Sequence, residues 1–317
     1  MSKSSRLAFG EEIALLGEQN NDIVVLDADL SKSTMSQIFA STFPDRFFEM
    51  GIEEAHMLGA SSGLALSGKI PYCCSFACFI TGRYDTIRIS IAYTNSNVRI
   101  IGTHAGIGIG EDGTSQMGLE DISLMRSLPN IVVCQPCDEI ETKALIRYSV
   151  MHKGPMYIRL TRQNLDELNS KDYKFEIGKG VQLTEGNDAV IFATGALVGE
   201  SKKASKILRE QNINLRVVNI HTIKPIDKDL IIACSKECDH IFTAEDHTII
   251  GGLGSAVCEV LSESYPKIVH RIGLNDVFGE SGTPEALYKK YGFNAEGIAR
   301  TILSKINSPS GKKRYHL

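Results

Sequence analysis

The sequence predicts an α/β protein with two domains, each built on a mainly parallel sheet, and three observations lead to this fold class. Short β-branched runs alternate with amphipathic stretches along most of the chain, which is typical of β-α-β units. Strand runs such as 22–27, with four consecutive apolar residues at 23–26, are continuous and not alternating, as expected for strands that are covered on both faces. A length of 317 residues, at about 150 residues per domain, fits two domains.

The expected elements follow this alternation in order. The first domain is predicted to contain helices at 6–18, 53–66, 79–92, from about 119, and 139–150, between strands at 22–27, 70–74, 98–103, 131–134 and 156–160. Residues 164–187 lack the rhythm and carry many charges, which indicates a linker. Strands at 189–194, 215–220, 240–244 and 267–272 begin the second series. We therefore expect a first domain over 1–180, linker included, a second over 181–307, and a flexible, solvated tail over 308–317.

Composition excludes several classes of function. The formal net charge is -4 and the sequence pI is about 6.1, which argues against a general nucleic-acid binder. No run approaches the roughly 18 apolar residues of a membrane span. Eight cysteines without a leader pattern favour a reducing, cytoplasmic setting. Cys134 and Cys137 have CxxC spacing, but Pro136 and the acidic run after it are typical of an ordinary turn into a helix, so a metal or redox centre is not favoured.

A glycine-rich segment over 102–117 follows a predicted strand and precedes a predicted helix, where open α/β sheets bind ligands. Residues 108–113 match GxGxxG by letter. A dinucleotide pyrophosphate would there meet the carboxylates Glu111 and Asp112 instead of backbone N–H groups alone. The acidic residue that should end the next strand is also missing, because 131–133 is apolar. The match therefore does not predict nicotinamide binding.

Glu54 lies in the first turn of a predicted helix, and local pattern leaves its role open. It could be a surface partner of the helix dipole or a functional carboxylate. Phe76 and Phe79, spaced i, i+3, would ordinarily be core residues.

The order of short motifs resembles the second half of transketolase. The matching residues run from Arg6 to about Ile306 and include Asp27-Ala-Asp29, Gly51-Ile-x-Glu54-x-x-Met57, Phe76-x-x-Phe79, Thr103-His104, Gly110-Glu-Asp-Gly113 and Arg162. The Thr-Gly82-Arg form and the length look like split transketolases, in which two chains make one enzyme. The resemblance implies a pyrimidine-binding type of domain followed by a transketolase C-terminal type of domain.

The resemblance also implies thiamine diphosphate as the cofactor and transfer of a two-carbon ketol unit from a ketose phosphate to an aldose phosphate. Glu54 matches the glutamate that bonds N1′ of the aminopyrimidine and so promotes loss of the C2 proton. Phe79 matches the ring that stacks on the pyrimidine, with Phe76 close by. Gln116 stands where many bacterial members have histidine; it can form hydrogen bonds to the cofactor but cannot carry a proton.

The implied substrate site needs convergent donors for a phosphate. Arg162 matches the phosphate arginine of the family, and its guanidinium suits a bidentate contact. Arg6, Ser33 and His104 match further donors, and Asp112 matches the acceptor of a sugar hydroxyl. Taken singly, each also has an ordinary structural interpretation. The residues of the second domain are expected to serve assembly, and none there is predicted to be catalytic.

A complete enzyme of this family also carries a Gly-Asp-Gly element with a downstream asparagine, which ligates Mg²⁺ and holds the diphosphate. This chain lacks that element, so no metal ligand is predicted here. The Mg²⁺ ligands, which should be oxygen atoms, are expected on an N-terminal transketolase subunit in an α₂β₂ assembly.

Three alternatives stay open at this stage. The C-terminal part of a deoxyxylulose-phosphate synthase shares the layout, although Gly-Glu-Asp-Gly with Ser-Gln-Met favours transketolase. The β subunit of a pyruvate-type dehydrogenase would not need the phosphate set. A non-catalytic assembly subunit would gain nothing from a buried glutamate.

Overall fold

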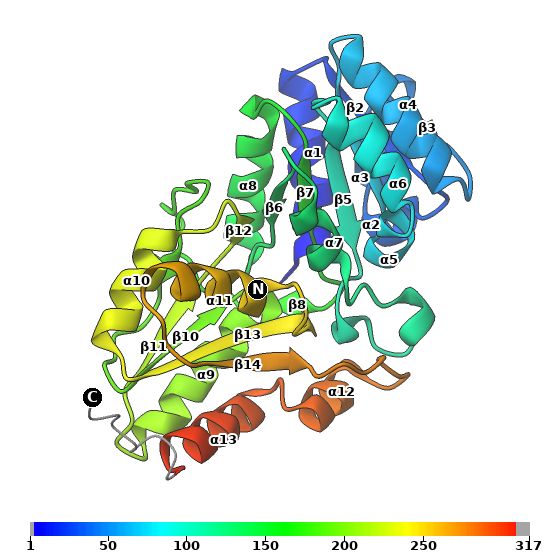
Figure 1. Cartoon of the computed structure of the whole chain (residues 1–317). Coiled ribbons are helices and arrows are strands. Elements are labelled where there is room, and N and C mark those ends of the chain that lie inside the picture. Colours follow the sequence, from blue (N-terminus) through cyan, green and yellow to red (C-terminus); the bar gives the residue numbers. More distant parts are fainter. Residues whose placement is uncertain (1–2, 309–317) are drawn as a thin grey trace.

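The first domain is built on a seven-stranded sheet. In the computed structural model, which describes residues 3–308, the strand order is β12-β6-β7-β5-β4-β2-β3, and every neighbouring pair is parallel except β12 with β6. The strands are β2 (Ile23–Asp27), β3 (Phe47–Glu49), β4 (Ile70–Phe76), β5 (Arg99–Thr103), β6 (Val132–Cys134), β7 (Met156–Arg159) and β12 (Thr222–Lys224). The carboxyl ends of the parallel strands β2 to β7 face the second domain (Figure 1).

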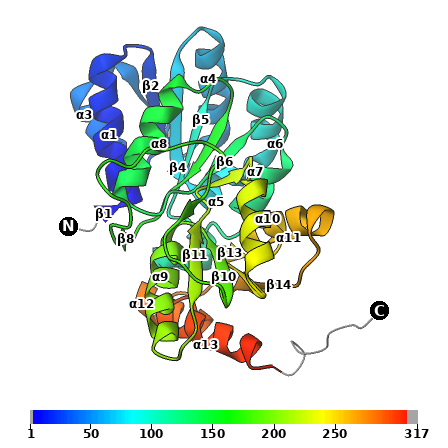
Figure 2. The same ribbon diagram turned by 90° about the vertical axis from the view of Figure 1, so that its left-hand side faces the viewer.

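Helices cover both faces of this sheet (Figure 2). Alternate strand residues face opposite cores: Ile23 and Val25 pack with α1, α3 and α8, whereas Val24 and Leu26 pack with α4 and the segments around it. This is the pattern of a strand buried on both sides. The helices are α1 (Ser5–Gln19), α2 (Ser31–Thr34), α3 (Gln37–Thr42), α4 (Glu54–Leu66), α5 (Ala77–Thr81), α6 (Tyr84–Thr86), α7 (Asp121–Ser127) and α8 (Glu139–Met151).

The second domain has a five-stranded sheet in the order β14-β13-β10-β11-β9, antiparallel only at β9. Two apolar cores flank it, one shared with α9 and α13 and the other with α10 and α11. The strands are β9 (Val181–Gln182), β10 (Ala189–Ala193), β11 (Leu215–Asn219), β13 (His240–Thr248) and β14 (Val269–Leu274). The helices are α9 (Ala196–Arg209), α10 (Lys228–Glu237), α11 (Leu253–Ser264), α12 (Pro284–Tyr291) and α13 (Ala295–Ile306).

The predicted fold class is confirmed, with local corrections. The helix expected over 79–92 is broken into α5, α6 and a π-helix (Ile87–Tyr93). Gly82 ends α5, and the wider π turn still buries Ile87 and Ile91, so the apolar spacing did not reveal the break. The expected linker contains β9 and also β8 (Asn164–Leu165), which pairs with β1 (Lys3–Ser4).

Strand β12 joins the two halves of the chain. It comes after the expected boundary near 180, yet it pairs with β6 at the edge of the first sheet. The tail expected to be flexible lies outside the described residues except for Ser308. No helix in the described part of the chain is long and apolar enough to cross a membrane.

A fully buried ion pair lies where the two domains meet. Arg159, at the end of β7, donates through Nε to Asp121 Oδ2 at 2.7 Å, and Tyr157 donates its hydroxyl to the same oxygen at 2.6 Å. The Arg159 Nη2 group also donates to the carbonyls of Gly118 and Asp246, the latter on β13 of the second domain. Burial alone would raise the pKa of Asp121, but the Arg159 charge and the hydrogen bonds hold it below its ordinary value.

We predict that Asp121→Asn destabilises the chain by about 3–5 kcal/mol, because it leaves the buried Arg159 charge without its counterion. The measurement is equilibrium urea unfolding. Asp22→Asn is the matched control: Asp22 pairs with Lys69 at 2.9 Å, but both side chains are largely exposed, so the cost should stay below about 1 kcal/mol. Equal decreases in the free energy of unfolding of the two variants would show that the buried ion pair contributes no more to stability than the exposed one.

Candidate active site

Three of the predicted phosphate-binding residues meet beyond the carboxyl ends of β2 and β5. Arg6, from the first turn of α1, donates through Nη1 to the Ser33 carbonyl at 2.6 Å and lies 3.2 Å from His104 Nε2. The buried Asp27 carboxylate accepts from Leu30 N and Thr34 Oγ1 and thereby fixes the turn that carries Ser33. Arg6 Nε is buried without a protein partner, so it is an unused donor beside this cluster.

The contacts of His104 define where its proton lies. A guanidinium can only donate, so Nε2 accepts from Arg6. Nδ1 lies 2.9 Å from Thr103 Oγ1 and carries the proton, while the Thr103 hydroxyl donates to the Ser75 carbonyl. The sequence predicted His104 as a donor to phosphate, whereas in this structure its one N–H is held by Thr103.

An aromatic stack leads from His104 toward Glu54. The Phe76 ring lies 3.8 Å from the His104 ring and 5.5 Å from the Phe79 ring, in stacked geometry with both. Glu54 begins α4 and is only 4% exposed. Its Oε1 accepts from Ser75 Oγ at 3.3 Å, and its Oε2 lies 4.0 Å from Arg83 Nη2. Burial removes the interpretation of Glu54 as a surface dipole partner.

Arg162 and Asp112 lie close together at the glycine-rich loop. Arg162 Nη1 donates to the Ile109 carbonyl at 2.6 Å and is 3.8 Å from Asp112 Oδ2 and 3.6 Å from Glu111 Oε2. Burial, and then the Arg162 charge, lowers the pKa of Arg6, which shows that the two cations share one region. Gln116 ends a 3-10 helix (Thr114–Gln116) and is half-buried; no described contact joins its side chain to the other predicted residues.

Neither CxxC cysteine has the character of a reactive thiol. Both are fully buried and free, and burial raises the pKa of Cys134 to about 12 and that of Cys137 well above its ordinary value. A neutral thiol is a poor nucleophile and a poor metal ligand. Cys137 instead accepts from the Asn219 side-chain amide at 3.3 Å, so it packs the two domains together.

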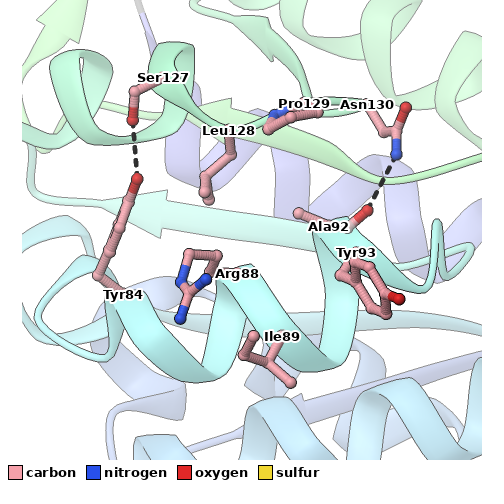
Figure 3. Close-up of a pocket in the computed structure, with 9 residues that line it drawn as sticks. All are labelled: Tyr84, Arg88, Ile89, Ala92, Tyr93, Ser127, Leu128, Pro129 and Asn130. Atoms are coloured by element: carbon pink, nitrogen blue, oxygen red, sulfur yellow. Dashed lines mark hydrogen bonds between the residues drawn. The ribbon is translucent and has the colours of Figure 1, made fainter.

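Two further observations limit the site. Residues 3–308 contain no group of three or more His, Cys, Asp or Glu side chains that could hold a metal ion. A separate hollow of about 340 Å³ lies between α6, the π-helix and the turn 127–130 (Figure 3), where Tyr84 bonds to Ser127 and Asn130 to the Ala92 carbonyl. It contains none of the predicted site residues.

Comparison with known proteins identifies the family of both domains. Residues 2–167 match the transketolase pyrimidine-binding domain, and residues 178–298 match the transketolase C-terminal domain. A protein described as a transketolase C-terminal section from Methanocaldococcus jannaschii is 46% identical over 96% of each chain. A 6-deoxy-6-sulfo-D-fructose transketolase subunit of a Clostridium species is 38% identical over 89% of this chain and 88% of its own.

A solved structure of a split-gene transketolase, an inactive β4 tetramer, superposes with a TM-score of 0.88 at 42% identity, over 96% of this chain and 99% of that one. The chain belongs to the transketolase family, with the two domains in the predicted order.

Sequence reasoning missed the residues that support the site. Ser75 and Thr103 form the hydrogen-bonded link between Glu54 and His104, and Arg83 is the cation nearest to Glu54. Ser75 directly precedes Phe76 at the end of β4, and Thr103 directly precedes His104 at the end of β5. The position of both residues at strand ends could have marked them as site residues. Their contact, however, follows only from the pairing of β4 with β5.

We predict that His104 stays neutral from about pH 8 down to about pH 5, because burial and the charges of Arg6 and Arg162 lower its pKa to about 3. The unfolded chain binds this proton near the ordinary pKa of 6.5, so the contribution of His104 to stability decreases as pH falls below that value. An NMR titration of the histidine Cε1–H resonances, assigned with His104→Asn, measures it. A titration midpoint near 6.5 would contradict the prediction.

Proposed function

We propose that this chain is the second-half subunit of a two-chain, thiamine-diphosphate-dependent transketolase, which transfers a two-carbon ketol unit from a ketose phosphate to an aldose phosphate. One observation carries the proposal: a continuous series of contacts joins the buried Glu54 carboxylate, through Ser75, Thr103 and the stacked rings, to the cationic Arg6–His104 cluster. Such an enzyme needs a carboxylate at the aminopyrimidine of the cofactor and cationic groups at the phosphate of the sugar.

The residues around Glu54 fit the aminopyrimidine end of the cofactor. A buried carboxylate with one weak hydrogen bond and one distant cation has acceptor capacity left for a protonated ring nitrogen. The partly buried Phe79 ring, which stacks on Phe76, offers a flat apolar face. When bound, thiamine diphosphate supplies the nucleophilic carbon and the electron sink; Glu54 holds the proton at N1′, and Gln116 contributes hydrogen bonds only.

The cationic end fits a phosphorylated sugar. Arg6 and Arg162 supply charge, the free Nε–H of Arg6 supplies a donor, and Ser33 lies against Arg6. In this role His104 orients Arg6 through Nε2, and it can donate to a phosphate only after its proton changes nitrogen or Arg6 turns away. Asp112, partly exposed beside Arg162, is placed to accept a sugar hydroxyl.

The diphosphate and Mg²⁺ are assigned to an N-terminal transketolase subunit, with an α₂β₂ assembly and one site between each pair of unlike chains. Three points support this: the chain lacks the Gly-Asp-Gly element, one relative is described as a C-terminal section, and the split-gene neighbour is described as inactive as a β4 tetramer. The free state of all eight cysteines accords with our expectation of a cytoplasmic protein.

Glu54→Gln tests the role of the buried carboxylate. We predict that the variant folds normally but loses at least about 100-fold in kcat of ketol transfer, because an amide cannot take over the proton-sharing role of the carboxylate. The measurement is steady-state transfer by the complex with the partner subunit. Glu53→Gln is the matched control, since Glu53 is adjacent but exposed. Near-normal turnover in Glu54→Gln would remove Glu54 from the chemistry.

The activity itself is tested with xylulose 5-phosphate and ribose 5-phosphate in the presence of thiamine diphosphate and Mg²⁺. We expect transfer from the mixture with the partner subunit, none from this chain alone, and light scattering that fits two copies of each chain. A parallel reaction with 6-deoxy-6-sulfofructose examines the sugar named for one relative.

Each other outcome decides against one part of the proposal. Transfer by this chain alone would overturn the assignment of the diphosphate site to a partner. Condensation of pyruvate with glyceraldehyde 3-phosphate would instead support the deoxyxylulose-phosphate synthase alternative. A firmly associated pair that is inactive with every sugar would favour a non-catalytic assembly subunit.

A further inference from the structure

The second domain grips the glycine-rich loop through one buried carboxylate. Asp246 lies on β13 and is only 2% exposed. Its Oδ1 accepts from the backbone N–H of Ile107 at 2.8 Å, and its Oδ2 accepts from the N–H of Gly108 at 3.2 Å and from the Tyr288 hydroxyl at 2.8 Å. Two consecutive loop amides are thus bound by a side chain that is 138 or more residues away in the sequence.

Two loop positions must be glycine because neighbouring side chains fill the space that a Cβ would occupy. A Cβ at Gly106, whose φ is +85°, would overlap the Asp246 carboxylate, and one at Gly108 would overlap the Gln163 side-chain amide. Gln163 in turn donates to the Tyr288 hydroxyl at 2.7 Å. Gln163, Tyr288 and Asp246 therefore form a connected series of hydrogen bonds that ends on the backbone amides of Ile107 and Gly108, and we call these three side chains the loop clamp.

The loop clamp lies next to the residues proposed to bind substrate. Gln163 follows Arg162 directly, and Arg162 donates to the carbonyl of Ile109, one residue beyond the clamped amides. The loop then carries Asp112, 3.8 Å from Arg162. The spacing between the phosphate arginine and the hydroxyl acceptor is consequently set by how residues 106–109 are held.

We propose that Asp246 and Tyr288 are positioning residues for the sugar-phosphate site, so that the second domain determines substrate affinity although it touches no reacting atom. The inference rests on the transketolase activity proposed above. A loop held by two amide hydrogen bonds is ordered before the substrate arrives, and a small displacement of groups that bind the substrate is costly in rate or affinity.

Tyr288→Phe removes one hydroxyl and keeps the ring, which packs edge-on against Phe293. In the complex with the partner subunit we expect the KM for sugar phosphates to rise about 5- to 10-fold, as for loss of one buried hydrogen bond, with kcat changed by less than about 2-fold. Asp246→Asn, which keeps one acceptor oxygen but loses the charge, should give a larger rise in the same direction. Tyr291→Phe is the matched control: it lies on the same helix, and its hydroxyl donates to Glu280 instead of the clamp.

A second measurement does not depend on the activity. Hydrogen exchange of the amides in residues 105–110, measured on the same complexes, should become at least about 10-fold faster in Tyr288→Phe than in Tyr291→Phe, because exchange there needs local opening of the clamp.

The outcomes separate the two proposals. Unchanged exchange overturns the clamp, and faster exchange with an unchanged KM overturns its role in positioning substrate. If the unmodified complex transfers no ketol unit from any sugar, the proposed function fails, and hydrogen exchange alone decides whether the clamp orders the loop. Similar KM values in Tyr288→Phe and Tyr291→Phe would show that loss of any α12 hydroxyl has the same effect, and would also overturn the inference.

Discussion

The structure depends on the pairing of the buried Arg159 charge where the two domains meet. A guanidinium cannot lose its charge in a protein, and this one has no solvent exposure. Its Nε and Nη2 groups donate to the Asp121 carboxylate at the start of α7 and to the carbonyls of Gly118 and Asp246. These partners belong to α7, to the end of the glycine-rich loop and to β13. One buried cation thus fixes three segments relative to one another, and the proposed site lies among them.

The same arrangement explains how opposite chemistries can stay close without neutralising each other. Hydrogen bonds through Ser75, Thr103 and His104 link the Glu54 carboxylate to Arg6 without a direct ion pair between them. A direct ion pair would consume the donors that the proposed phosphate needs. The neutral form of His104 avoids adding a third positive charge next to Arg6 and Arg162.

The sequence predicted the parts of the fold that follow from local periodicity. Strands such as 22–27 and 189–194 were recognised because burial on both faces gives them uninterrupted apolar runs, at 23–26 and 189–193. The break at Gly82 was missed because the π-helix preserves the burial of Ile87 and Ile91, so the apolar spacing resembles that of one helix. Strand β12 was missed because three residues carry no readable period, and only tertiary pairing with β6 defines them as a strand.

The prediction of the site shows the same difference between what the sequence contains and what only tertiary contacts define. Glu54, Arg6, Ser33, His104, Asp112 and Arg162 were predicted from their place in an ordered set of motifs; contacts join Arg6 to Ser33 and His104, and Arg162 to Asp112, as two separate groups. Their supports were not identified, since Ser75 and Thr103 bind across two adjacent strands and Asp246 acts from the other domain. Gln116 was predicted with this set, but no described contact links its side chain to it. Motifs record which residues are needed, whereas hydrogen bonds over more than a hundred residues decide how those residues are held.

The proposed division of the enzyme between two chains would make internal order more important for this one. If the partner supplies the diphosphate and Mg²⁺ ligands, as proposed, then each chain has to present its half of the site without the other half as a template. Within the described residues, this chain itself supplies contacts that hold Arg6, His104, Arg162 and the glycine-rich loop. The conformational entropy of ordering that loop is therefore lost during folding, and it does not have to be lost again when the partner and the sugar bind. A clamp from the second domain is the physical means by which a half-site can be ordered before assembly.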